Sequence, residues 1–204
     1  MKRIKGNNIK KIFYDEDNNS IIKTFNNKIA RVEVKFWNEV TCLQLLHKNF
    51  VNKYNIHYPF PKLIHYNTDE LSITTSYCGI QARLNTSIKP KQLKYTITCI
   101  IDNLKRNFLI YKDIHPNNVC IDTRGYIYLV DFDAGFLLNY EDYIPITSSQ
   151  PYKRCNSHNY KKEYFNNYYK KPNNIREYRN YDINTLSDWK SKPWSMLYMF
   201  KGIK

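Results

Sequence analysis

The stretch YKDIHPNNVCIDTRGYIYLVDFD, residues 111–133, places an aspartate, an asparagine and a second aspartate close together in sequence. Asp113 and Asn118 lie five residues apart, on either side of Pro116. Because proline does not continue a helix, both residues should belong to one tight loop. Carboxylate and amide oxygens suit magnesium. The loop therefore predicts a site that handles metal ions and protons.

The second aspartate, Asp131, follows the run of residues 126–130, which is rich in β-branched and aromatic residues and predicts a strand. Turn-forming residues at 123–125 come directly before this run. A loop, a hairpin and the end of a strand should therefore bring Asp113, Asn118 and Asp131 together.

This pattern, D-x-x-x-x-N followed by V-D-F, resembles the catalytic loop and the metal-binding motif of the protein-kinase-like phosphotransferases. Members of that family also carry a lysine on a strand and a glutamate on the next helix that pairs with it. Lys23 lies in the predicted strand 20–25, and sixteen residues later Glu39 lies in an amphipathic helical segment around 33–50. Five polar residues thus follow the family's order.

The resemblance implies an α+β chain with a compact, two-lobe protein-kinase-like fold. A reduced, β-rich N-terminal lobe, residues 1–77, would bind the nucleotide and contain the helix around 33–50. A small, mainly helical C-terminal lobe, residues 78–204, would carry the catalytic residues. This second lobe would include a basic arm rich in tyrosine and asparagine at 151–180.

The resemblance also implies a role for each polar residue, with ATP and magnesium as cofactors. Lys23 would contact the α- and β-phosphates, and Glu39 would orient it. Asp113 would accept the proton of the acceptor hydroxyl or orient that hydroxyl. Asn118 and Asp131 would hold the metal ions.

The adenine is expected at a hinge between the lobes. A predicted hairpin of 63–66 and 71–75 leads into Ser76, Tyr77 and Cys78. In the family the backbone of the hinge binds adenine through hydrogen bonds. We therefore expect Ser76, Tyr77 and Cys78 to contact it.

Two departures from the family bear on the acceptor and on regulation. Tyr111-Lys112 stands where many protein kinases have His-Arg, and Asp133 stands where the metal-binding motif usually ends in glycine. His115 makes the loop closer to that of aminoglycoside, choline and lipopolysaccharide kinases, but the region after Asp133 is short for their substrate domain. We expect a protein serine/threonine kinase, with a small-molecule kinase as the alternative.

The glycine-rich loop of the family has no counterpart here, since Gly6 is the only glycine before Lys23. Residues 9–14 can form one full strand, with at most a stub of strand before it. Asn7 and Asn8 tolerate a left-handed backbone and could form a short turn over the phosphates. The missing loop makes a pseudokinase, or a binding module that uses its basic arm, the second alternative.

The chain of 204 residues has a formal net charge of +14, which favours an anionic partner such as a nucleotide, a nucleic acid or an acidic protein. No apolar run approaches the roughly 20 residues that span a bilayer. Five cysteines without C-x-x-C spacing indicate reduced, mostly buried thiols and argue against a zinc site. We expect a cytoplasmic protein, in the host cytoplasm or virion if the source is viral.

The C-terminal third is compositionally different. The basic arm at 151–180 has eight Lys or Arg and six Tyr but almost no aliphatic residues, so we expect an extended or partly disordered segment. A solvated or docking segment is favoured over binding of single-stranded nucleic acid. A helix across 93–108 should form the core of the second lobe, and short helices at 181–189 and 194–200 should close it. The resemblance implies that Asp182 braces the catalytic loop.

Overall fold

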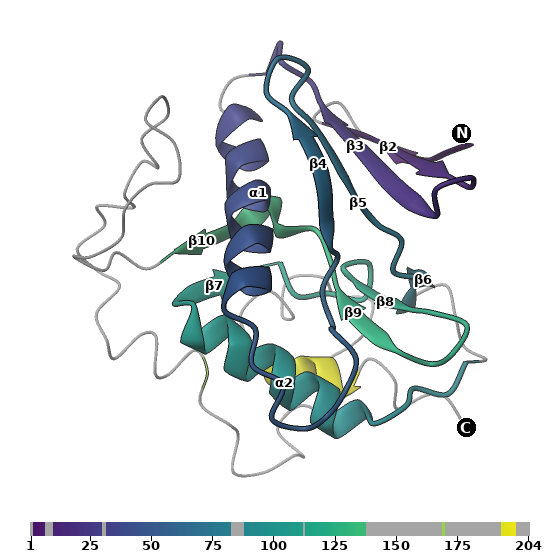
Figure 1. Ribbon diagram of the computed structural model, residues 1–204, viewed down its shortest axis with the longest axis vertical. Helices are drawn as coiled ribbons and strands as arrows, with labels where there is room; N and C mark the ends of the chain where they lie inside the picture. The colour runs from purple at the N-terminus through teal and green to yellow at the C-terminus, as the bar shows by residue number, and fades with distance from the viewer. Residues whose placement is uncertain are drawn as a thin grey trace.

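A five-stranded antiparallel sheet forms one end of the computed structural model, which describes residues 2–6, 10–29, 32–82, 88–111, 113–137, 169 and 193–198 (Figure 1). The strand order is β1-β2-β3-β5-β4. The strands are β1 (Lys2–Gly6), β2 (Lys10–Asp15), β3 (Ser20–Phe25), β4 (Leu63–Asn67) and β5 (Ser72–Ser76). The sequence predicted β2 to β5 well, whereas β1 is a full strand of five residues rather than a stub.

Local hydrogen bonds stabilise two turns of this sheet, the β2–β3 turn and the β4–β5 turn. Asn18 Nδ2 donates to Asp15 Oδ2 at 2.8 Å, and Asn19 closes the β2–β3 turn with a φ of 46°. In the β4–β5 turn, Asn67 Oδ1 accepts the backbone N–H of Asp69 at 2.9 Å. Asparagine supplies such bonds and tolerates positive φ at lower cost than most residues.

The helix α1 (Val32–Lys48) belongs to two hydrophobic cores. Its first half packs Phe36 and Val40 against Phe25 of β3 and Ile73 of β5. Its second half contributes Cys42, Leu43 and Leu46 to a larger core. The helix therefore connects the sheet to the rest of the structure, as Figure 1 shows.

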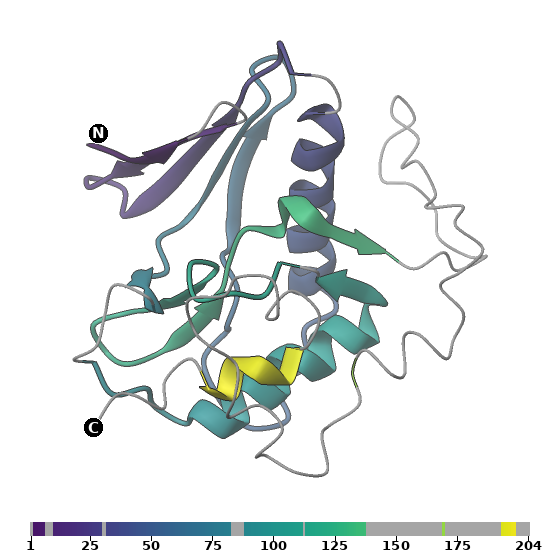
Figure 2. The ribbon, with the colours of Figure 1, turned by 180° about the vertical axis from the view of Figure 1, so that it is seen from behind.

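The larger core is built on α2 (Leu93–Arg106), which buries an apolar face that includes Ile97, Ile100 and Leu104. Short antiparallel strands pack around it in two small sheets, β6-β8-β9 and β10-β7. These strands are β6 (Ile80–Gln81), β7 (Leu109–Tyr111), β8 (Val119–Ile121), β9 (Ile127–Leu129) and β10 (Gly135–Leu137). Two 3-10 helices, η2 (Phe132–Ala134) and η4 (Pro193–Tyr198), complete the described elements, and Figure 2 shows η4 lying along α2.

These elements confirm the α+β prediction. We expected a mainly helical region after residue 77. The described part of that region contains five short strands beside α2, so it holds more strand than expected. The cysteines at 42, 78, 99 and 120 are buried and unbridged, as expected for those four. In the described part of the chain, no helix combines the length and apolar character needed to cross a membrane.

The C-terminal region reaches the larger core at two places. Tyr169, from the basic arm, is buried, and its hydroxyl donates to the backbone carbonyl of Leu109. Trp194 Nε1 donates to the carbonyl of Tyr169 at 3.0 Å, and Met196 is fully buried. Tyr169 is therefore one point at which the basic arm contacts the core. The rest of that arm and residues 181–189, with Asp182, lie outside the described residues, so the expectation of an extended or partly disordered arm stays a prediction.

The connection from β5 to β6 depends on Gly79. Its φ is +90°, and a Cβ atom there would lie 2.1 Å from the carbonyl oxygen of Ile121. Because a side chain would meet rigid backbone rather than a flexible side chain, only glycine fits this contact.

We predict that Gly79→Ala lowers the free energy of unfolding by about 3 kcal/mol, since it adds left-handed strain and a backbone clash. The measurement is urea denaturation. The control is Ile80→Ala, at a neighbouring side chain that is 42% exposed, which should change stability by no more than about 0.5 kcal/mol. Equal stability of the two variants would contradict the prediction.

Candidate functional site

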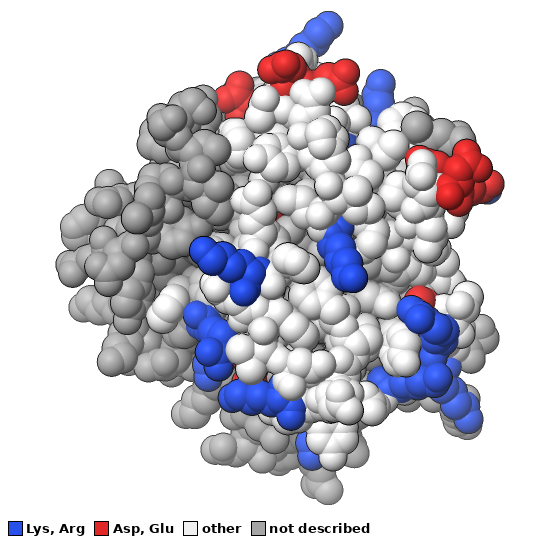
Figure 3. Space-filling view, viewed as in Figure 1, with Lys and Arg blue, Asp and Glu red and all other residues white. Residues whose placement is uncertain are grey.

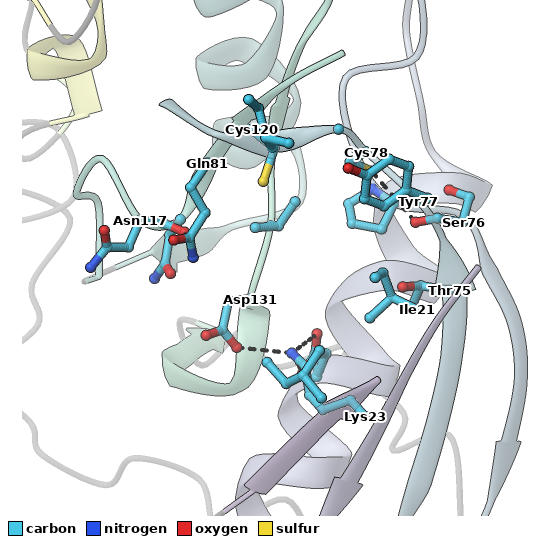
Figure 4. A pocket seen from close by; sticks show the side chains of 17 residues that line it. Ile21, Lys23, Thr75, Ser76, Tyr77, Cys78, Gln81, Asn117, Cys120 and Asp131 are labelled. Carbon is cyan, nitrogen blue, oxygen red and sulfur yellow. Dashed lines mark hydrogen bonds and ion pairs between the residues drawn. The ribbon is translucent and has the colours of Figure 1, made fainter. Parts of the chain in front are cut away.

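A cavity of about 330 Å³ lies between the five-stranded sheet and the β8–β9 hairpin. Figure 4 shows side chains from both sides pointing into it. Seven of the eight predicted site residues line this cavity: Lys23, Glu39, Ser76, Tyr77, Cys78, Asn118 and Asp131. Asp113, the eighth, is joined to it by a hydrogen bond with Asn118. The structure thus collects residues that are up to 108 positions apart in the sequence.

The innermost contact is the ion pair of Lys23 and Glu39. Lys23 Nζ lies 2.6 Å from each carboxylate oxygen of Glu39, and both residues are buried. Burial alone would lower the pKa of Lys23, but the nearby carboxylates of Asp131 and Glu39 outweigh it and raise that pKa. The lysine is therefore a permanent cation at the cavity wall.

Asp131 receives the second contact of Lys23, with Nζ 2.9 Å from Oδ1. Burial would raise the pKa of Asp131, but the ammonium groups of Lys23 and Lys10 hold that pKa well below its ordinary value. The backbone of Asp131 is left-handed, with a φ of 69°. The Tyr111 hydroxyl donates to the carbonyl of Val130 at 2.5 Å and also lies 3.0 Å from that of Asp131. This buried tyrosine fixes the strained turn that aims the carboxylate.

Lys10 and Asp133 are parts of the site that the sequence did not predict. Lys10 Nζ lies 2.5 Å from Asp131 Oδ1 and 2.8 Å from Asp133 Oδ2. The register of β2 and β3 pairs Lys10 with Phe25 and Ile12 with Lys23. Lys10 is therefore the diagonal neighbour of Lys23 on the same face of the sheet. Two-residue alternation along β2, together with that register, would have located it.

The loop of Asp113 is held by its own side chains. Asn118 Nδ2 donates to both the backbone carbonyl and Oδ2 of Asp113 at 3.0 Å. His115 Nδ1 accepts the backbone N–H of Asn117 at 3.2 Å, which leaves Nε2 to contact Asp113 Oδ2 at 3.3 Å. The hydrogen bond from His115 outweighs partial burial and lowers the pKa of Asp113 below its ordinary 3.8. The aspartate is thus ionised at neutral pH.

The hinge segment uses two of its three backbone donors within the protein. The N–H of Ser76 donates to the carbonyl of Lys62 at 2.9 Å, and the N–H of Tyr77 donates to that of Asn19 at 3.1 Å. Among the described residues, none accepts the N–H of Cys78. Cys78 also lines the cavity.

The residues present fit a magnesium ion that shares its coordination with a ligand. Asp131 and Asn118 supply one carboxylate and one amide to the same cavity. The described residues contain no cluster of three or more His, Cys, Asp or Glu side chains that could enclose a metal by themselves. Magnesium commonly uses one or two protein ligands, with phosphates and waters completing the shell. The donor set therefore suits a metal that arrives with a phosphate compound.

No known protein-family model matches this chain.

We predict that His115→Ala moves the pKa of Asp113 upward toward 3.8, because it removes the largest cause of the lowered value. Carbon NMR of the Asp113 carboxyl group over acidic pH measures this. The folded pKa is below the unfolded one, so ionised Asp113 stabilises the fold above the unfolded pKa, and this stability is lost as the pH falls through the folded pKa. His115→Ala should therefore weaken the acid dependence of unfolding.

The control for this measurement is His65→Ala, which removes an exposed histidine of β4. It should leave the Asp113 titration unchanged. An Asp113 pKa that is the same in His115→Ala and in the natural protein would show that the His115 contact does not set it.

Proposed function

We propose that this protein is an ATP- and magnesium-dependent phosphotransferase with a compact, two-lobe kinase-like fold, and that it transfers the γ-phosphate to a hydroxyl group. The observation that carries the proposal is the contact of Lys23 with both Glu39 and Asp131 inside the cavity. The Asp113–Asn118 loop borders the same cavity. This reaction needs a cation for the phosphates, a carboxylate that binds the metal and a second carboxylate that positions the acceptor hydroxyl.

The lining of the cavity supports the proposal of a nucleotide. The hinge end offers the backbone N–H of Cys78 and apolar side chains, including Ile21 and Ile80, that suit adenine. The opposite end holds Lys23, which would contact phosphate oxygens while Glu39 keeps its ammonium in place. Bound magnesium would neutralise developing charge on the phosphates, with Asp131 and Asn118 as its protein ligands.

Asp113 would act on the acceptor. Its side chain is 32% exposed, so an incoming hydroxyl can reach it. Because its pKa is lowered, it is a weak base, and its main role would be to orient the hydroxyl for in-line attack. The proton of the hydroxyl then has an acceptor within hydrogen-bond reach as the new oxygen–phosphorus bond forms.

We propose a serine or threonine hydroxyl of a protein as the acceptor. His115, at 3.3 Å from Asp113, is the observation that favours a small acceptor instead, because it adds a polar group beside the catalytic carboxylate. The ion pairs of Lys10 with Asp131 and Asp133 favour a third candidate, a pseudokinase whose metal ligand is already neutralised.

The charged side chains on one face of the molecule are mixed. On the face that Figure 3 shows, basic side chains are scattered from the upper margin to the lower part, and acidic ones gather near the upper and right margins. The basic groups on this face do not form one continuous stripe of the kind that follows a nucleic-acid backbone. The net charge of +14 remains compatible with an acidic protein or a nucleic acid.

We predict that the purified chain transfers labelled phosphate from ATP with magnesium, to itself or to a basic acceptor protein, and that Asp113→Ala and Asp131→Asn each lower the rate at least about 100-fold. Asp17→Asn, in an exposed turn, is the matched control and should retain full activity. The measurement is the initial rate of phosphate incorporation.

The other outcomes separate the candidates. Hydrolysis or transfer that appears only when amino sugars or choline are added would identify a small acceptor. Nucleotide binding without turnover on any acceptor would identify a pseudokinase. Activity that survives both Asp113→Ala and Asp131→Asn would place the reaction elsewhere and refute the proposed site.

A further inference from the structure

The position of Lys10 is unusual for a lysine. It is the first residue of β2, only 8% exposed, and its ammonium reaches the carboxylate oxygen that Lys23 also contacts. Two like charges therefore lie within 2.9 Å of one oxygen atom in a buried place. Such an arrangement is costly to desolvate, and an apolar residue often stabilises a fold as well or better. A ligand that uses both cations would account for its presence.

The partners of Lys10 point to the kind of ligand. Both Asp131 and Asp133 lie on the segment that carries the proposed metal ligand. The phosphate oxygens of a nucleotide carry several negative charges, so they would compete with Asp131 and Asp133 for the ammonium of Lys10. A divalent cation on Asp131 would assist this exchange, because it weakens the attraction of that carboxylate for the ammonium.

Asp133 is able to release Lys10 without losing all its contacts. Lys35 Nζ lies 3.6 Å from Asp133 Oδ2, and Asn38 Nδ2 donates to the Asp133 carbonyl at 3.2 Å. Both partners come from α1, so the helix holds Asp133 from the other side. Lys10 can therefore leave while Asp133 keeps a counter-charge.

The sequence before Lys23 explains why a lysine would be needed here. Backbone N–H groups can cradle phosphates when successive residues adopt the conformations that glycine allows. Only Gly6 is available in that region. A lysine on a flexible stem binds phosphate as a point charge and needs no special backbone.

We propose that Lys10 is a second phosphate-binding cation of the nucleotide site, which moves from Asp131 and Asp133 to the phosphates when the nucleotide binds. This inference rests on the proposed function, because it assumes that the cavity binds a nucleotide polyphosphate. Lys10 thereby takes over the task that backbone donors of a glycine-rich loop would perform.

The test compares binding of ADP and of adenosine by calorimetry, in the natural chain, in Lys10→Met and in Lys11→Met. Lys10→Met should weaken ADP binding about tenfold or more, as expected for loss of a charge-assisted hydrogen bond. Adenosine binding should not change, because adenosine has no phosphate. Lys11 is the exposed neighbour on the opposite face of β2, so Lys11→Met should leave both affinities unchanged.

Repeating the calorimetry in EDTA, which removes magnesium, shows whether Lys10 contacts the phosphates directly or only positions Asp131. A lysine that touches the phosphates still contributes when magnesium is removed, so the loss in Lys10→Met should persist. If Lys10 only positioned Asp131 for the metal, Lys10→Met would weaken ADP binding only when magnesium is present. The inference would be overturned if Lys10→Met lost ADP affinity only in the presence of magnesium. It would also be overturned if the variant lost as much affinity for adenosine as for ADP.

Asp133→Asn provides a second variant that does not depend on the folding of Lys10→Met. It removes the carboxylate charge that competes for Lys10, so ADP should bind at least as tightly as to the natural chain. Weaker ADP binding in Asp133→Asn would overturn the inference, since Lys10 would then act only through Asp133.

Failure of the inference is distinguishable from failure of the proposed function. A natural chain that binds neither ADP nor adenosine refutes both. A natural chain that binds ADP and transfers phosphate, together with unchanged ADP binding in Lys10→Met, refutes the role of Lys10 and leaves the phosphotransferase in place.

Discussion

The buried ion-pair cluster around Asp131 is the contact on which the arrangement of this molecule depends. It joins β2, β3, α1 and the turn after β9, through Lys10, Lys23, Glu39 and Asp131. No other contact in the described residues brings charged groups from so many elements into one buried place. The position of α1 between the two hydrophobic cores is what allows Glu39 to meet the sheet and the turn at once.

The balance of charge explains how this cluster tolerates burial. Three lysines face three carboxylates in the connected group of Lys10, Lys23, Lys35, Glu39, Asp131 and Asp133, in which Lys35 is the most exposed, at 39% of its side chain. Each ammonium has at least one carboxylate within 3.6 Å, so no charge is left isolated. Even so, a balanced buried network seldom stabilises a fold more than apolar packing does. The left-handed backbone of Asp131 adds strain at the same point, which is where functional sites tend to store it.

Local patterns in the sequence were sufficient for most elements, whereas the polar residues of the candidate site were chosen from the family resemblance. The alternation at 20–25 gave β3 with the observed bounds, and the helical spacing around Glu39 gave α1 within two residues at each end. Lys10 was missed because its role depends on the register between β2 and β3, which no local pattern determines. Tyr169 was missed because the composition of a thirty-residue segment hides one side chain that a distant core can bury.

The distribution of donors along the cavity has a consequence for the proposed nucleotide. The backbone N–H groups of Ser76 and Tyr77 donate to the carbonyls of Lys62 and Asn19, so the proposed hinge would offer adenine only the N–H of Cys78 and apolar walls. The opposite end of the cavity, in contrast, has two ammonium groups beside the carboxylate of Asp131. Charge-assisted hydrogen bonds are about twice as strong as neutral ones. Recognition in this site would therefore depend mainly on the polyphosphate, and the base would be selected chiefly by the shape of the cavity.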